Sequence, residues 1–357
     1  ATTFQKPPSV AAAMAEAMAT MSSPGRGGHR AAMLAADTAF ACREALAELF
    51  HLSNPEQVVF TMNATHALNL AIKSLVPPGG RAVISGYEHN AVTRPLAALG
   101  AQVRVARGPL FDPPAVLEAF ARQIGPDTHA VICSHVSNVF GFVQPIEEIA
   151  ALCRRRGIPL IVDASQSAGV LPLDMTALGA AFLAMPGHKG LYGPQGTGVL
   201  VCGEGVPVRT LLEGGTGSMS IQQHMPDFLP DRLEAGTHNM PGIAGLLAGV
   251  RYVHERELAQ MAVEGLQKLK GLQVFALPDL RAQTDVVSFR MEGRDAEDVG
   301  ASLAAEDIAV RAGIHCAPLA HRSAGTLETG TVRVSVSDFN TPGEITRLIA
   351  GVKALIS

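Results

Sequence analysis

The chain has 357 residues, of which 47% are hydrophobic and 17% are charged, and its formal net charge is −4. This composition excludes a disordered chain and a surface built throughout to hold nucleic acid or an anionic membrane. The length predicts two domains, and the 36 glycines with few aromatic residues favour an α/β enzyme. No run of about 18 apolar residues occurs, so no membrane span is expected.

The predicted elements begin with an amphipathic helix at 10–21, where Glu16 argues against a signal segment. Because the chain starts at Ala1 without an initiator methionine, we expect a few residues to precede it in the natural protein. Short apolar runs then alternate with helical patterns. We predict helices at 65–75, 115–123 and 146–155 and strands at 58–61, 81–85, 102–106, 130–133, 159–162, 181–184 and 198–201. This alternation predicts a mostly parallel sheet covered on both faces.

After Pro241 the pattern changes to that of a smaller α/β unit. We predict one or two helices within 243–269, further helices at 296–305 and 344–356, and strands at 286–289 and 332–336. The N-terminal helix is expected to pack with this unit. The predicted division is a large domain of residues 12–242 and a small domain of residues 1–11 and 243–357.

The five cysteines are odd in number and contain no C-x-x-C, which excludes a disulfide framework and a zinc ribbon. A reduced, cytoplasmic protein without a metal is therefore expected. Cys316 lies in a flexible segment, 311–318, beside His315 and Arg311, and neighbouring cationic groups favour the reactive thiolate. We expect the other four thiols to be packed in the core: Cys42, Cys133, Cys153 and Cys202.

Polar residues that follow strands are the strongest candidates for a functional site, because ligands of open α/β sheets bind where strands end. Lys189 stands in a glycine-rich turn that leads into another strand, which excludes a phosphate loop of the P-loop type. A confined lysine instead favours a Schiff base, with an ordinary loop lysine as the alternative. Asp163 either caps a helix or pairs with a protonated heteroaromatic nitrogen, as in enzymes of pyridoxal 5'-phosphate (PLP).

Three weaker signals accompany these two residues. The turn at 61–68 offers helix N-terminal amides and the Thr65 hydroxyl to a phosphate, or simple capping by Asn63 or Thr65. His89 either stacks on a cofactor ring or is a structural hydrogen-bonding residue. Arg333 lies within a predicted strand, where a buried arginine favours a carboxylate ligand.

In this order along the chain, the signals resemble the cysteine desulfurases of the class V aminotransferase group nearly end to end. The similar segments are 1–3, 63–69, 88–90, 137–138, 163–166, 187–189, 233–239 and 311–317. Arg-x-Gly-x-His-Cys-Ala at 311–317 resembles the SUF-type, or group II, desulfurases and the related selenocysteine lyases. His315–His321 and Gly325–Arg333 resemble strings of bacterial cysteine desulfurase family proteins. The resemblance implies PLP fold type I, with a mostly parallel seven-stranded sheet in the large domain and a smaller C-terminal α/β domain.

The resemblance also implies how PLP would be held. Lys189 would form the Schiff base and move protons, Asp163 would pair with the pyridine nitrogen, and Gln166 would bond the ring hydroxyl. His89 would stack on the ring as a catalytic residue. The remaining cofactor-binding positions would be Thr65 and His188 at the phosphate, Ala64 and Asn138, and Thr237 from a second subunit, which implies a homodimer.

Substrate binding is implied at Asn138, Arg333 and Arg311, with Arg333 on the carboxylate, and Cys316 would take the sulfur as a persulfide. Two positions depart from the SUF-type pattern. Pro186 stands where a hydroxyl residue often precedes Gly-His-Lys, and His66 replaces an acidic residue. Together with the differing stretch 318–329, these departures leave open the choice between sulfur and selenium.

We therefore expect a PLP-dependent cysteine desulfurase that converts L-cysteine to L-alanine and serves a SufE/SufU-like acceptor protein. Three alternatives stay open. They are a selenocysteine lyase acting on L-selenocysteine, a class V aminotransferase or C–S β-lyase, and a non-catalytic sulfur-carrier binding partner. No nucleic acid or membrane partner is expected.

Overall fold

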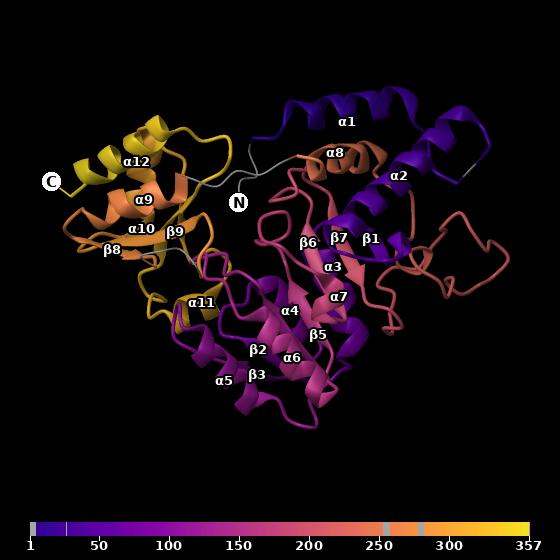
Figure 1. The fold of residues 1–357 in the computed structure, drawn as a ribbon, viewed down its shortest axis with the longest axis horizontal. Helices are drawn as coiled ribbons and strands as arrows, with labels where there is room; N and C mark the ends of the chain where they lie inside the picture. The colour runs from indigo at the N-terminus through magenta and orange to yellow at the C-terminus, as the bar shows by residue number, and fades with distance from the viewer. Residues whose placement is uncertain (1–4, 26, 253–257, 278–281, 357) are drawn as a thin grey trace.

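Short apolar runs in the middle of the chain form a seven-stranded sheet, and residues near the C-terminus form a second sheet of four strands (Figure 1). The computed structural model describes residues 5–25, 27–252, 258–277 and 282–356. The segment 1–3, one of those that carry the resemblance, lies outside the described residues.

The large sheet has the strand order β1-β7-β6-β5-β4-β2-β3. Strand β7 is antiparallel to both of its neighbours, and the other adjacent strands are parallel. The predicted seven-stranded, mostly parallel sheet is thus confirmed. Its strands are β1 (Val58–Thr61), β2 (Arg81–Ser85), β3 (Gln102–Ala106), β4 (Ala130–Ser134), β5 (Leu160–Asp163), β6 (Phe182–Pro186) and β7 (Gly198–Cys202).

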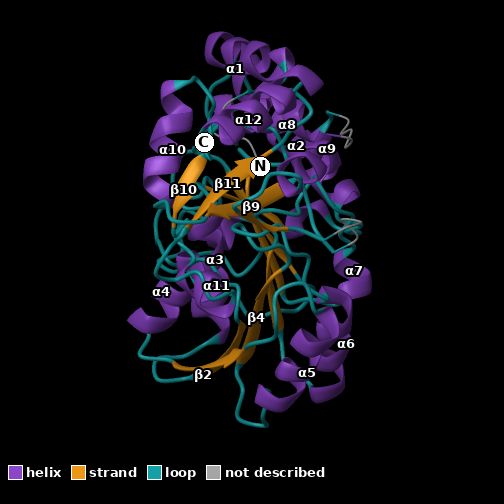
Figure 2. Cartoon of the chain, turned by 90° about the vertical axis from the view of Figure 1, so that its left-hand side faces the viewer, coloured by secondary structure: helices purple, strands orange, loops and turns teal. Residues whose placement is uncertain are grey.

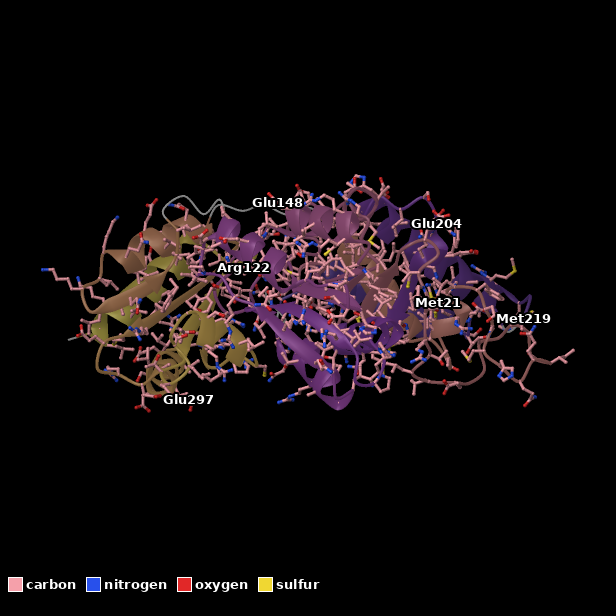
Figure 3. All side chains as sticks on the ribbon, turned by 90° about the horizontal axis from the view of Figure 1, so that it is seen from below. Met21, Arg122, Glu148, Glu204, Met219 and Glu297 are labelled. Atoms are coloured by element: carbon pink, nitrogen blue, oxygen red, sulfur yellow. The ribbon has the colours of Figure 1, made fainter. Side chains whose placement is uncertain are left out.

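Helices cover both faces of this sheet because successive strand residues point to opposite sides. Val131 packs into one core and Ile132 into the other. The first core is covered by α2 (Arg30–Leu49), α5 (Pro113–Gln123), α6 (Ile146–Arg156), α7 (Met175–Leu178) and α8 (Met240–Val250). The second is covered by α3 (Ala64–Leu75) and α4 (Asn90–Ala98). Arg122, Glu148 and Glu204 are exposed outside these layers (Figure 3).

The small sheet is antiparallel throughout, in the order β10-β11-β9-β8. Its strands are β8 (Leu272–Phe275), β9 (Val286–Met291), β10 (Arg311–Gly313) and β11 (Thr331–Ser335). A separate core joins this sheet to α9 (Leu258–Gln267), α10 (Ala296–Ala305) and α12 (Pro342–Ala354) (Figure 2). The remaining helix of this part, α11 (Pro318–Ser323), packs on the large sheet through Ala320.

The first helix, α1 (Pro8–Thr20), lies against α8 (Figure 1). Ile243 and Leu246 of α8 belong to the core of the large sheet. The predicted boundary between residues 242 and 243 falls inside α8, and the division into two domains stays a prediction. Within the described ranges, no helix has both the length and the apolar character needed to cross a membrane.

The segment 311–318 differs from its prediction as one flexible loop. It begins as strand β10, and helix α11 starts at Pro318, so Ile314–Ala317 is a short turn between two regular elements. Three residues of strand and six of helix are too short to give a periodic sequence signal, so the sequence did not reveal these two elements. The flexibility of the segment stays a prediction.

Candidate active site

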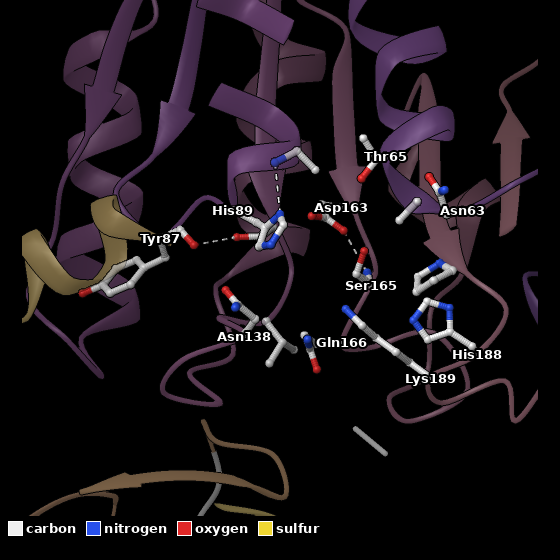
Figure 4. Close-up of a pocket in the computed structure, with 15 residues that line it drawn as sticks. Asn63, Thr65, Tyr87, His89, Asn138, Asp163, Ser165, Gln166, His188 and Lys189 are labelled. Carbon is white, nitrogen blue, oxygen red and sulfur yellow. Dashed lines mark hydrogen bonds between the residues drawn. The ribbon is translucent and has the colours of Figure 1, made fainter. Parts of the chain in front are cut away.

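A pocket opens where strands β4, β5 and β6 end and helices α3 and α4 begin (Figure 4). It holds about 590 Å³ of space, part of it continuous with solvent. The pocket brings together eight predicted site residues: Ala64, Thr65, His89, Asn138, Asp163, Gln166, His188 and Lys189.

Lys189 follows β6 in the turn Gly187-His188-Lys189, and its side chain points into the pocket (Figure 4). Burial lowers the pKa of the Lys189 amine to about 8, although the negative charge of Asp163 opposes this change. More of the amine is therefore in its nucleophilic, neutral form. The turn needs glycine at 187, because a Cβ there would overlap Thr197 Oγ1. The Lys6 ammonium stabilises the same turn by donating a hydrogen bond to the His188 carbonyl at 2.7 Å.

Asp163 ends strand β5, and only 4% of it is exposed. One carboxylate oxygen accepts a hydrogen bond from Ser165 N at 2.9 Å. The alternative that Asp163 caps a helix is wrong, since turns follow it and the next helix, α7, begins only at Met175. Burial lowers the pKa of Lys189 and of His89, and the Asp163 charge opposes both changes, which places this carboxylate within electrostatic reach of the two bases.

His89 is a structural hydrogen-bonding residue, which was one of its two predicted roles, and it also lines the pocket. Its Nδ1 accepts from Ala91 N at 3.0 Å and caps helix α4. Burial lowers its pKa, so the ring is neutral near pH 7. The ring can therefore stack on an aromatic cofactor without adding positive charge.

The phosphate-binding candidates lie at the other end of the pocket. Asn63 caps helix α3 by accepting from His66 N at 2.9 Å, which confirms the capping alternative for Asn63. Ala64 and Thr65 follow in the first turn, where free amides favour an anion. His188 Nδ1 is buried and has no hydrogen-bond partner among the residues that the structure describes. That orphaned atom fits a ligand with polar oxygens.

Arg333 and Asn138 connect the pocket to the small sheet. Arg333 Nη1 donates to the Asn138 carbonyl at 2.8 Å, while Arg333 Nε is buried without a partner in the described part of the chain. No carboxylate of the described residues forms an ion pair with Arg333, which fits the expected binding of a ligand carboxylate. Arg311 pairs with Arg333 across β10 and β11 and is exposed, and neither arginine is among the residues that line the pocket.

Cys316 is exposed, and the other four cysteines are buried as predicted. Burial raises the pKa of Cys42 and of Cys153 to about 12, which makes those thiols inert. His315 and Cys316 both have left-handed backbone conformations, with φ of 53° and 57°. Such φ values are uncommon outside glycine and mark a strained turn.

Two hydrogen bonds hold this turn against the pocket. Asn90 N donates to the Cys316 carbonyl at 2.9 Å, and Asn138 Nδ2 donates to the His315 carbonyl at 2.9 Å. One expectation is wrong. Burial lowers the pKa of His315 to about 3, so this imidazole is neutral and is no cationic neighbour of the thiol. Cys316 itself is not among the residues that line the pocket.

Thr237 lies away from this pocket. It is exposed and lines a second hollow together with His66. Its predicted contact with the phosphate of another subunit stays a prediction. Of the two departures noted in the sequence, Pro186 lines the first pocket and His66 does not.

Several contributors to the site carried no recognisable sequence signal. Lys6 reaches the lysine turn from 182 residues away. Asn90 acts through its backbone amide, which no motif reveals. Ser134 and Tyr87 line the pocket from β4 and from the loop after β2. Only strand-end position, a general feature of α/β sheets, pointed toward Ser134.

Comparisons with known proteins agree with this geometry. The model of the family described as "Aminotransferase class-V" matches residues 1–348. A "Probable cysteine desulfurase" of Mycolicibacterium paratuberculosis is 33% identical over 353 residues, covering 92% of this chain and 50% of that protein. A protein of the same description from Xylella fastidiosa is 36% identical over 339 residues, covering 87% of this chain and 79% of that protein. The chain thus spans half the length of the first relative and about four fifths of the second.

Two solved structures are similar over nearly the whole chain. The apo cysteine desulfurase of Thermococcus onnurineus has a TM-score of 0.87 at 30% identity, covering 98% of this chain and 92% of that one. The cysteine desulfurase CsdA of Escherichia coli, in an S-sulfonic acid form, has a TM-score of 0.83 at 25% identity, covering 98% and 91%. This similarity confirms the fold class expected from the sequence.

Proposed function

Because the chain belongs to the class V aminotransferase family, we propose that it is a PLP-dependent cysteine desulfurase. It converts L-cysteine to L-alanine and transfers the sulfur to Cys316. The relatives and the similar structures are described as cysteine desulfurases, which supports this assignment.

One observation carries the proposal. The only exposed cysteine of the described residues lies on a turn that is hydrogen bonded to both sides of the lysine pocket. On one side the turn is held by Asn90, next to His89, and on the other by Asn138. A thiol in this place can meet a substrate sulfur whose carbon is held above Lys189.

The residues present fit PLP. Lys189 is an amine whose pKa is lowered to about 8 by burial and that can bond the aldehyde, and Asp163 is a buried carboxylate for the pyridine nitrogen. The N-terminal amides of α3 and the unpartnered His188 Nδ1 fit the phosphate. Gln166 and His89 border the space between, where they fit the ring hydroxyl and the ring face. When bound, PLP supplies the electron sink for bond breaking at the substrate.

The chain's own residues then have separate tasks. Arg333 and Asn138 orient the substrate carboxylate and amino group, and Lys189 moves the α-proton. The Cys316 thiolate attacks the substrate sulfur, so an S–S bond forms as the Cβ–S bond breaks. The electron pair of the broken bond leaves with the carbon, which is protonated to give alanine. Cys316 retains the sulfur as a persulfide.

The proposal includes a homodimer. Large apolar side chains are exposed on α2 and on the segment 212–228, which extend at the same end of the molecule (Figure 1). Ile221 is 96% exposed, and Met33, Phe40, Leu212 and Phe228 accompany it. Burial in a second copy accounts for these exposed apolar side chains. Thr237, which lies beyond this segment, would then reach the partner's phosphate site. The cytoplasmic location and the SufE/SufU-like acceptor stay predictions.

The test compares Cys316→Ala with Cys153→Ala, whose thiol is buried in α6. Both variants should be yellow with bound PLP, and borohydride should fix the cofactor onto Lys189. Only Cys316→Ala should lose alanine formation from cysteine. Undiminished alanine formation would remove Cys316 from the mechanism, and activity confined to selenocysteine would favour the lyase. Keto-acid formation would favour an aminotransferase or β-lyase, and a colourless protein that PLP cannot restore would contradict the proposal.

A further inference from the structure

A glutamate with no assigned role lies directly behind the wall of the pocket. Glu88 is completely buried, with 0% exposed, between Tyr87 and His89 in the chain. Its Oε1 accepts hydrogen bonds from Ser85 Oγ, from Ser134 N at 2.8 Å and from Ser134 Oγ at 3.3 Å. Its Oε2 has no hydrogen-bond partner in the described part of the chain.

The other buried glutamate shows what Glu88 lacks. Glu234 is also buried, but both of its oxygens accept from the Arg43 guanidinium, at 2.8 and 2.6 Å. No lysine, arginine or histidine among the described residues forms an ion pair with Glu88. An ionised carboxylate that is buried without a counter-charge is strongly unfavourable, so such a group is usually protonated.

The hydrogen-bonded cluster around Glu88 also has fewer donors than acceptors. Gln144 Nε2 donates into the same group of atoms, at 3.2 Å to both Ser85 Oγ and Ser134 Oγ. Gln144 Oε1 is buried and has no partner among the described residues. The cluster of Ser85, Glu88, Ser134 and Gln144 therefore contains two carbonyl-type oxygens without a donor. A protonated Glu88 brings one more donor into this cluster, whereas an ionised Glu88 brings only acceptors.

The titratable groups facing Glu88 from the packed elements favour the same state. Asp163 at the end of β5 presents a negative charge, and Cys133 on β4 stays a neutral thiol because burial raises its pKa. On Glu88's own segment, Tyr87 is neutral because burial raises its pKa, and His89 is neutral because burial lowers its pKa. Burial raises the pKa of Glu88 to about 8, against the hydrogen bonds from Ser85 and Ser134 and with the help of Asp163.

We propose that Glu88 is a positioning residue that acts as an uncharged acid. It holds Ser134 at the end of β4 behind the pocket through the hydrogen bonds to its carboxyl oxygen. It also avoids a second negative charge close to Asp163. This inference rests on the proposed function, because the charge of Asp163 matters most when a protonated ring nitrogen faces it. Ionisation of Glu88 at alkaline pH would strengthen proton binding by every group in the pocket.

The first measurement uses the cofactor-free protein. In the unfolded chain Glu88 ionises near its ordinary pKa of 4.5, whereas in the folded chain it keeps its proton up to about 8. The wild type therefore loses stability from this group as pH rises between these values, and the loss is constant above 8. Glu88→Gln has no such loss and retains a donor for the cluster. Its unfolding midpoint, relative to wild type, should rise by several degrees from pH 5 to pH 8 and then level off.

Glu148→Gln is the matched control, since Glu148 is an exposed glutamate in the first turn of α6 (Figure 3). Its midpoint relative to wild type should stay constant across the same range. A constant difference for Glu88→Gln, or one that falls as pH rises, would overturn the proposal, because a carboxylate that stabilises the fold behaves in that way. This outcome is independent of whether the protein binds PLP.

The second measurement follows the absorption of bound PLP as a function of pH. Without an ionisable group at position 88, the pocket lacks the additional negative charge at alkaline pH. The midpoint of the absorption change should therefore lie at lower pH in Glu88→Gln than in wild type and in Glu148→Gln. Identical midpoints would refute the electrostatic part of the inference. A failure to bind PLP or to form alanine would instead count against the proposed function.

Discussion

Replacing Glu234 with glutamine tests how strongly a buried charge pair holds this fold together. Glu234 accepts from Arg43 Nη1 and Nη2 at 2.8 and 2.6 Å and from Phe60 N at 2.6 Å. The guanidinium carbon lies 4.2 Å from the centroid of the Phe60 ring. Side-chain exposure is 8% for Arg43 and 3% for Glu234, so water cannot replace the lost partner. In the variant, the Arg43 charge stays buried without a counter-charge.

Removing one partner of a buried pair costs about 3–5 kcal/mol. With an unfolding entropy of about 2.1 cal/mol/K per residue and 357 residues, the unfolding midpoint falls by about 4–7 °C. The control is Glu118→Gln, which breaks the exposed pair with Arg122 on α5 and costs about 0.3–0.5 kcal/mol. Scanning calorimetry of both variants measures the difference. A Glu234→Gln loss no larger than that of the control would refute the argument from burial.

Three further predictions concern the site. Arg333→Lys should raise KM for cysteine about 10–100-fold, since a charge-assisted hydrogen bond contributes about 1.5–3 kcal/mol. A planar guanidinium can donate to the Asn138 carbonyl and to a carboxylate at the same time, whereas an ammonium cannot do so with the same geometry. Steady-state kinetics of alanine formation measures this, and an unchanged KM would exclude Arg333 from substrate binding. Gly187→Ala should weaken PLP binding because its Cβ would overlap Thr197 Oγ1, whereas Gly215→Ala, where a Cβ meets nothing within 4 Å, should not. Absorbance titration compares the two, and equal affinities would contradict the steric argument. The rate at which cofactor-free protein captures PLP should rise about tenfold per pH unit up to the Lys189 pKa of about 8 and then level off. Stopped-flow absorbance follows this rate, and a rise that continues toward pH 10 would show an ordinary lysine.

Strand positions were predictable from the sequence because buried parallel strands are continuous apolar runs. Strands β1, β2 and β3 have the predicted bounds. Helix α2 was missed although it has 20 residues, because its buried face consists largely of alanines such as Ala32, Ala35 and Ala39. Alanine gives little contrast between the two faces of a helix. Helix α4 was missed because it contains Pro95, which usually ends a helix.

The site was predictable where the type of a residue and its position at the end of a strand indicate its chemical role, as for Lys189 and Asp163. It was not predictable where the chemistry arises from neighbours brought together by folding. Glu88 was visible in the Glu88-His89-Asn90 string, but Gln144, which joins its cluster through Ser85 and Ser134, is more than fifty residues away in the chain and carries no signal of its own. The neutral state of His315 likewise follows from burial, which the residues beside it in the chain do not reveal.

The place of β1 at the edge of the large sheet leaves this strand without its partner during much of the protein's synthesis. Among the described strands, its only neighbour in the sheet is β7, and Val58 pairs with Val201. At about 5–20 residues per second, a ribosome needs on the order of 7–30 s to make the intervening chain. During that interval the apolar strand Val58–Thr61 has no partner. A nascent chain that stalls before residue 198 would expose this strand to other chains, and aggregation of such truncated products is the expected consequence.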